Sequence, residues 1–64
     1  MKVLVLGSSG LLGSTLVPIL KYGGHEVIEQ SLSSSTQYNV DMSDSNKAST
    51  FLSKTDPEII INLI

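Results

Sequence analysis

The sequence predicts an α/β fold, with elements in the order β-α-β-β-α-β around a parallel sheet. Three observations predict it. Short apolar runs rich in Val, Ile and Leu alternate along the 64 residues with two stretches whose apolar residues recur at helical spacing. Strands that alternate with helices favour parallel pairing through right-handed crossovers. No internal repeat or domain boundary interrupts the pattern, so we expect one sheet.

The first strand and helix follow from the apolar pattern. "KVLVL" at residues 2–6 is a continuous apolar run, which suits a strand that is buried on both faces. A helix is predicted over residues 11–22, with a slight kink at Pro18 and an end at "GGH". Its expected apolar face follows the spacing i, i+4, i+7 and i+8, at Leu12, Leu16, Ile19 and Leu20.

The second strand is expected at residues 26–30, "EVIEQ", followed by a polar loop at 31–36. A weaker third strand is expected at residues 37–42, "QYNVDM". The β-branched run "EIIINLI" at 58–64 predicts the fourth strand. We expect both tyrosines, Tyr22 and Tyr38, to be partly buried with their hydroxyls in water.

A second helix is predicted between the third and fourth strands. Ser43 is the expected N-cap, and Asp44 would complement the helix dipole. Ala48, Phe51 and Leu52 supply an apolar stripe at i, i+3 and i+4. "TDP" at 55–57 ends the helix, since proline disfavours helical conformation in the residue before it.

Three glycines lie at the junction of the first strand and helix, in "GSSGLLG" at residues 7–13. A strand-to-helix loop presents unpaired backbone N–H groups and a positive dipole end, which suits a phosphate. Gly7 would permit the turn off the strand, Gly10 a close approach of pyrophosphate, and Gly13 close packing of the helix on the strand. The spacing G-x-x-G-x-x-G is one residue wider than the common dinucleotide motif. A mononucleotide loop is disfavoured because "GST" at 13–15 lacks the required lysine.

Composition excludes several classes of function. The chain has no cysteine and one histidine, which leaves no disulfide and no zinc site. No apolar run approaches the length of a membrane span, so no membrane partner is expected. A net charge of −2 with scattered lysines argues against nucleic acid. We expect a soluble protein of a reducing compartment, the cytoplasm.

"MKVLVLGSSGLLGSTLVPILKYGGHEV", followed by "DMSD" and "DPEIIINLI", resembles the start of the extended short-chain dehydrogenases, the NAD-dependent epimerase/dehydratase superfamily. Within it the sequence is most similar to the dTDP-4-dehydrorhamnose reductase branch of sugar-nucleotide reductases. The resemblance covers all 64 residues. It implies the N-terminal part of a Rossmann domain, residues 1–64, with the strand order 3-2-1-4 and truncated after the fourth strand.

The resemblance also implies roles for individual residues. The second strand ends where the family carries an acid that binds the ribose, and Ser31 aligns with that acid. Glu29 is the alternative, because a shift of the register by two residues keeps the same strand face and would put its carboxylate in this place. Asp41 would accept from the adenine amine, although a simple helix-start acid remains an alternative. Asn62 matches the end of the family's fourth strand, next to the residues that line the ribose beside nicotinamide. It suits equally well a local role in satisfying backbone groups at the strand end. The full set implied to bind NADP or NAD is Gly7, Ser9, Gly10, Leu11, Leu12, Gly13, Ser31, Asp41, Met42 and Leu63.

The implied function is hydride transfer to a keto-sugar nucleotide by a larger parent protein. The family's catalytic Tyr-x-x-x-Lys is absent, because neither Tyr22 nor Tyr38 has a lysine four residues later. The implied partners are the dinucleotide and a nucleotide-sugar substrate, with a homodimer left open. Three alternatives also stay open: a regulatory subunit that binds the dinucleotide without turnover, an epimerase or dehydratase of the same superfamily, and a purely structural fragment.

Overall fold

The computed structural model describes the whole chain, Met1–Ile64. It is an α/β structure with the predicted element order. Neither helix has the length and apolarity needed to cross a lipid bilayer. The elements are β1 Lys2–Leu6, α1 Leu11–Tyr22, β2 Glu26–Ser31, β3 Tyr38–Asn39, α2 Ser45–Thr55 and β4 Ile59–Asn62.

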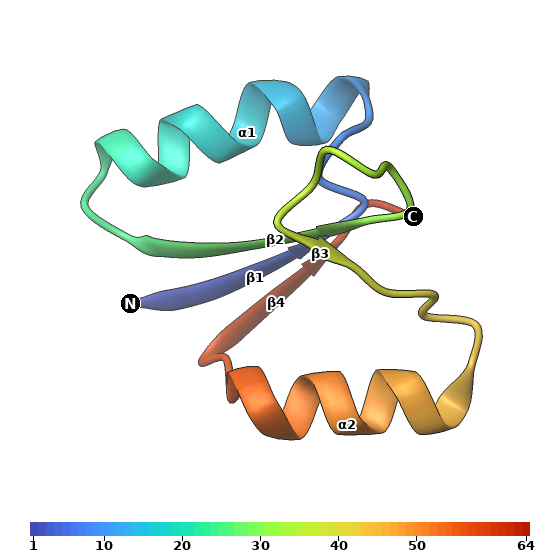
Figure 1. Cartoon of the computed structure of the whole chain (residues 1–64). Coiled ribbons are helices and arrows are strands. Elements are labelled where there is room, and N and C mark those ends of the chain that lie inside the picture. Colours follow the sequence, from blue (N-terminus) through green and yellow to red (C-terminus); the bar gives the residue numbers. More distant parts are fainter.

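The four strands form one sheet with the order β3-β2-β1-β4, and every pair is parallel, which confirms the predicted topology. In the centre, Val3 of β1 lies opposite Val27 of β2 and Ile59 of β4. Because the strands are parallel, their carboxyl ends meet at one edge of the sheet. The glycine loop, the loop after β2 and the C-terminal end of the chain all lie there (Figure 1).

The two helices lie on opposite sides of the sheet, so each face has its own small core (Figure 1). Alternate residues of β1 point into the two cores, which explains why this strand is apolar without interruption. The core under α2 contains Leu4, Leu6, Ile28 and Phe51, and the core under α1 contains Val3, Val5 and Val17.

The predicted apolar face of α1 is wrong in part. Leu12 is 68% exposed and Ile19 is 62% exposed, whereas the buried residues of the helix are Gly13 and Val17. Gly13 faces inward because the start of the helix lies directly against the loop backbone, and this orientation turns Leu12 outward. Tyr22 was expected to be partly buried, but it is the last residue of the helix and is 97% exposed.

The predicted cap of α2 is wrong by one residue. The N-cap is Asp44, whose carboxylate accepts hydrogen bonds from the backbone N–H groups of Asn46 (3.0 Å) and Lys47 (3.1 Å). Ser43 does not cap the helix, because its hydroxyl instead donates to Asp41. Both residue types are good caps, and the pattern alone does not decide between neighbours.

The strand ends also differ from the prediction. β3 has two residues instead of the six expected at 37–42, and β4 has four instead of the seven expected at 58–64. β2 runs one residue further and includes Ser31. β3 ends before Val40, whose carbonyl accepts a hydrogen bond from the side chain of Gln30.

Candidate functional site

A cavity of about 490 Å³ opens at the carboxyl ends of β1, β2 and β4. In open parallel sheets, this is the edge at which ligands bind. The cavity gathers residues from four segments that are separate in the sequence. They are Gly7, Ser9, Gly10, Gln30, Ser31, Leu32, Asp41, Met42, Ser43, Leu63 and Ile64.

Seven of the ten residues expected to bind a dinucleotide line this cavity: Gly7, Ser9, Gly10, Ser31, Asp41, Met42 and Leu63. The other three lie in the first turn of α1, which follows the glycine loop. Asn62 does not line the cavity, and its side chain accepts from the backbone N–H of Ile64 at 3.0 Å. This hydrogen bond corresponds to the local alternative considered for Asn62.

Gly7 makes the turn that leads the chain off β1. Its φ of +76° lies in the left-handed region that favours glycine. A Cβ there would lie 3.1 Å from the carbonyl carbon of Leu63 and 3.2 Å from the nitrogen of Ile64. Gly7 therefore permits both the turn and the close approach of the end of β4.

The N-terminal end of α1 is not capped by any side chain, and its first turn contains no acidic residue. Ser14 is the first helical residue whose N–H is bonded, to the carbonyl of Gly10 at 2.9 Å. Four backbone N–H groups before it have no acceptor within the chain, those of Ser9, Leu11, Leu12 and Gly13. The end of α1 at the cavity thus carries free donors together with the positive end of the helix dipole.

Helix α2 provides the contrast, because the carboxylate of Asp44 occupies the N–H groups of its first turn. The two helix starts therefore differ in chemistry within one chain. The start of α1 is the one that is open to an external anion, and its N-cap, Gly10, lines the cavity.

Asp41 is the one carboxylate that lines the cavity. The hydroxyl of Ser43 (2.6 Å) and its backbone N–H (3.0 Å) both donate to the same carboxylate oxygen. These hydrogen bonds, the hydroxyl first, lower the pKa of Asp41 below its ordinary value, and the charge of Lys47 adds a smaller effect. At neutral pH, Asp41 is an ionised acceptor at the mouth of the cavity.

The two candidates for the end of β2 lie in different surroundings. Ser31 is buried, lines the cavity, and bonds through its hydroxyl to Thr36 and to the N–H of Ser33. Glu29 does not line the cavity, and its carboxylate pairs with Lys21 of α1 at 3.0 Å. The residue that faces the cavity from the end of β2 is therefore neutral.

Gln30 is a residue of the cavity that the sequence analysis missed. It is 2% exposed, and it bonds to the glycine loop on one side and to the segment after β3 on the other. Its position two residues after Ile28, on the same face of β2, is the signal that would have singled it out, because an amide on a buried face needs partners.

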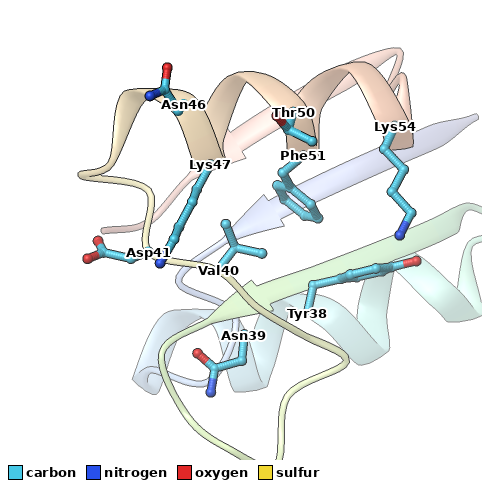
Figure 2. A pocket seen from close by; sticks show the side chains of 9 residues that line it. All are labelled: Tyr38, Asn39, Val40, Asp41, Asn46, Lys47, Thr50, Phe51 and Lys54. Atoms are coloured by element: carbon cyan, nitrogen blue, oxygen red, sulfur yellow. The ribbon is translucent and has the colours of Figure 1, made fainter.

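A second cavity, of about 480 Å³, lies between β3 and α2 and shares Asp41 with the first. Figure 2 shows the rings of Tyr38 and Phe51 beside the side chains of Lys47 and Lys54, which extend from α2 toward the sheet. The two rings pack at a centroid distance of 5.3 Å. The side chains of the two lysines in this second cavity are exposed and make no hydrogen bond or ion pair there, and its one carboxylate, Asp41, is shared with the first cavity.

The comparisons with known proteins address the family of the chain. The family model described as the RmlD substrate binding domain matches residues 1–64. The chain belongs to the RmlD family. This match confirms the resemblance to the dTDP-4-dehydrorhamnose reductase branch that the motifs carry. No curated protein and no solved structure matched this RmlD-family chain.

Membership of the RmlD family places the chain among proteins that resemble dTDP-sugar reductases. The name of the family refers to binding of a substrate. The cavity at the glycine loop, by contrast, has donors suited to phosphate, which a nucleotide-sugar and a dinucleotide both contain. The family name therefore does not distinguish a nucleotide-sugar from a dinucleotide as the ligand of this cavity, and the distinction has to come from the residues that line it.

Proposed function

We propose that the chain is the dinucleotide-binding N-terminal part of an RmlD-type reductase, and that its cavity takes the AMP half of NADP(H) or NAD(H). The observation that carries the proposal is the uncapped start of α1, whose free N–H groups adjoin the cavity. A pyrophosphate would accept hydrogen bonds from these N–H groups, as the carboxylate of Asp44 accepts them from the first turn of α2.

The other side of the cavity suits a nucleoside. Asp41 is ionised and accepts hydrogen bonds, which matches the amine of adenine. Met42 and Leu63 supply apolar surface for the base and for the ribose beyond it. The cavity thus combines donors for phosphates with an acceptor and apolar surface for a nucleoside.

The proposed reaction of the complete reductase is hydride transfer to a keto-sugar nucleotide. The bound nicotinamide would supply the hydride. The residues described here bind and orient the cofactor, since the chain contains no Tyr-x-x-x-Lys. The general acid and the lysine that orients it would come from another part of the reductase.

The test is calorimetric titration of the full-length protein with NADPH, NADH and dTDP. We expect either dinucleotide to bind and dTDP to leave that binding unchanged. If dTDP displaces the dinucleotide from the cavity, or if only dTDP binds, the site belongs to the nucleotide-sugar and the proposal is wrong. ADP serves as the control ligand, because it contains the proposed AMP half without nicotinamide.

The regulatory subunit is the second candidate, because the same cavity would serve a protein that binds the dinucleotide without turning it over. NADPH consumption in the presence of a dTDP-4-keto sugar separates the two. Consumption identifies a reductase, whereas binding of NADPH without consumption identifies a regulatory subunit.

A further inference from the structure

Gln30 connects the two walls of the cavity. On one side it contacts Gly7, which starts the glycine loop. On the other it contacts Val40, which directly precedes Asp41 and Met42. Its side chain is 2% exposed, so the connection lies inside the protein rather than on its surface.

The glycine loop is held by Gln30 through backbone and side chain together. The carbonyl of Gln30 accepts from the N–H groups of Gly7 and Ser8, both at 2.9 Å, and from the hydroxyl of Ser8 at 3.2 Å. Its side-chain oxygen Oε1 also accepts from the N–H of Gly7, at 3.1 Å. The N–H groups that Gln30 occupies are therefore not those left free for an anion.

The chemistry of the two side-chain partners requires an amide. The N–H of Gly7 can only donate and the carbonyl of Val40 can only accept. Only a side chain with an acceptor and a donor at its tip satisfies both from one buried position. A leucine offers neither group, and an ionised glutamate offers no donor to Val40.

We propose that Gln30 is a positioning residue that fixes the separation between the pyrophosphate end and the adenine end of the dinucleotide site. This inference rests on the proposed function. Gln30 holds Gly7, and with it the loop that carries the free donors. It holds Val40, and with it the carboxylate of Asp41, so a ligand that spans the cavity meets both ends at a fixed distance.

Two variants separate positioning from stability. Gln30→Leu removes both side-chain hydrogen bonds and leaves the carbonyl of Val40 without a partner. We expect it to weaken the binding of NADPH and of ADP alike, by about tenfold or more. The control is Thr55→Val, because Thr55 is also buried and bonds through its hydroxyl to Phe51, away from the cavity. It should lower the melting temperature and leave both affinities unchanged.

Gln30→Glu adds a readout that a merely structural role would not move. An ionised carboxylate would repel the carbonyl of Val40, but a protonated carboxyl donates to it and still accepts from Gly7. Burial raises the pKa of such a carboxyl. We therefore expect the affinity of Gln30→Glu, relative to the wild type at the same pH, to recover as the pH falls.

The experiment is titration of the full-length wild type and these variants with NADPH and with ADP, at neutral and at mildly acidic pH. Unchanged affinities in folded Gln30→Leu and Gln30→Glu would overturn the role of Gln30 while the proposed function stands. A deficit of Gln30→Glu that does not depend on pH would also overturn it. If the wild type binds neither ligand, the proposed function fails and this inference fails with it.

Discussion

The Cβ that a side chain would add at Gly13 lies 2.5 Å from the carbonyl oxygen of Ser8 and 2.6 Å from the carbonyl carbon and Cα of the same residue. The neighbour is backbone, so it cannot rotate away as a flexible side chain would. Helix α1 therefore touches the glycine loop at a distance that only glycine permits. The third glycine of the motif serves this contact with the loop rather than with β1 itself.

Gly13→Ala should consequently destabilise the fold, because overpacking against a fixed backbone costs about 1–3 kcal/mol. In a domain of this size each kcal/mol corresponds to about 4–8 °C in melting temperature. Gly23→Ala at the other end of α1 is the matched control, since its φ is −75° and its nearest neighbours lie at 3.5 Å. Equal melting temperatures for the two variants would contradict the contact.

Gly10→Val should lose dinucleotide binding and keep its fold, in contrast to Gly13→Ala, which should lose stability. A Cβ at Gly10 meets only the carbonyl oxygen of Gly7, at 3.6 Å, and the backbone there is extended (φ −73°, ψ −179°). The added side chain would instead occupy the cavity next to the free N–H groups. Calorimetry with NADPH and a thermal melt of the same sample check both halves of the prediction. Wild-type affinity in Gly10→Val would show that no pyrophosphate lies there.

Ser43→Ala should raise the pKa of Asp41 toward its ordinary value, because both hydrogen bonds that lower it come from Ser43 and the hydroxyl bond is lost. A lowered pKa in the folded state stabilises the fold above the ordinary pKa, and this contribution is lost as the pH falls through the folded value. The affected window therefore lies below about pH 4. A carbon-detected NMR titration of the Asp41 carboxyl measures the shift, with Ser45→Ala as control. An unchanged midpoint would exclude Ser43 as the cause.

The cavity should accept both dinucleotides with a mild preference for NADPH. Ser31 at the end of β2 is neutral, so it does not repel a 2′-phosphate, which carries close to two negative charges. The preference stays mild because no lysine or arginine lines this cavity. The ratio of kcat/KM for NADPH over NADH in the full-length protein tests it. A strong NADH preference that Glu29→Ser abolishes would identify Glu29 as the ribose acid, despite its ion pair with Lys21.

The 64-residue polypeptide studied alone should be marginally stable and should self-associate. β4 is an edge of the sheet, and Ile59 and Ile60 on it are 42% and 49% exposed. An apolar edge strand is a template for pairing with a second chain. Ile60→Lys should reduce the association measured by sedimentation velocity, since lysine on an edge disfavours pairing. A monomeric wild-type polypeptide with a cooperative melt would contradict the prediction.

The sequence predicted the element order well, because the apolar runs, the helical spacing of apolar residues and the glycines beside the first helix all indicated the same elements. It predicted less well where several residues compete for one role. Ser43 and Asp44 are both good caps, and only the hydrogen bond from Ser43 to Asp41 selects the second. The orientation of α1 depended on the packing of Gly13, which periodicity of large apolar residues cannot indicate.

The candidate site was likewise predicted in part, where a sequence motif marks the residues, and missed where only the folded structure brings the partners together. Glycine spacing placed the loop, and the resemblance supplied Ser31, Asp41 and Leu63, which the fold brings to one cavity. Gln30 was missed because its partners are backbone groups of residues 23 and 10 positions away. A side chain that binds backbone leaves no complementary residue type in the sequence, so no pattern of pairs reveals it.

The uncapped start of α1 has a consequence for protein engineering. A Ser or Asp at position 10 would suit the extended backbone there and would cap the helix, a change that stabilises a protein by only a few tenths of a kcal/mol (roughly 0.2–0.5), because glycine is itself a tolerated N-cap. The same side chain would occupy the donors proposed to receive pyrophosphate. If the proposed site is correct, selection for heat resistance alone would therefore favour variants that bind the nucleotide less well, a conflict between stability and function at a single loop position.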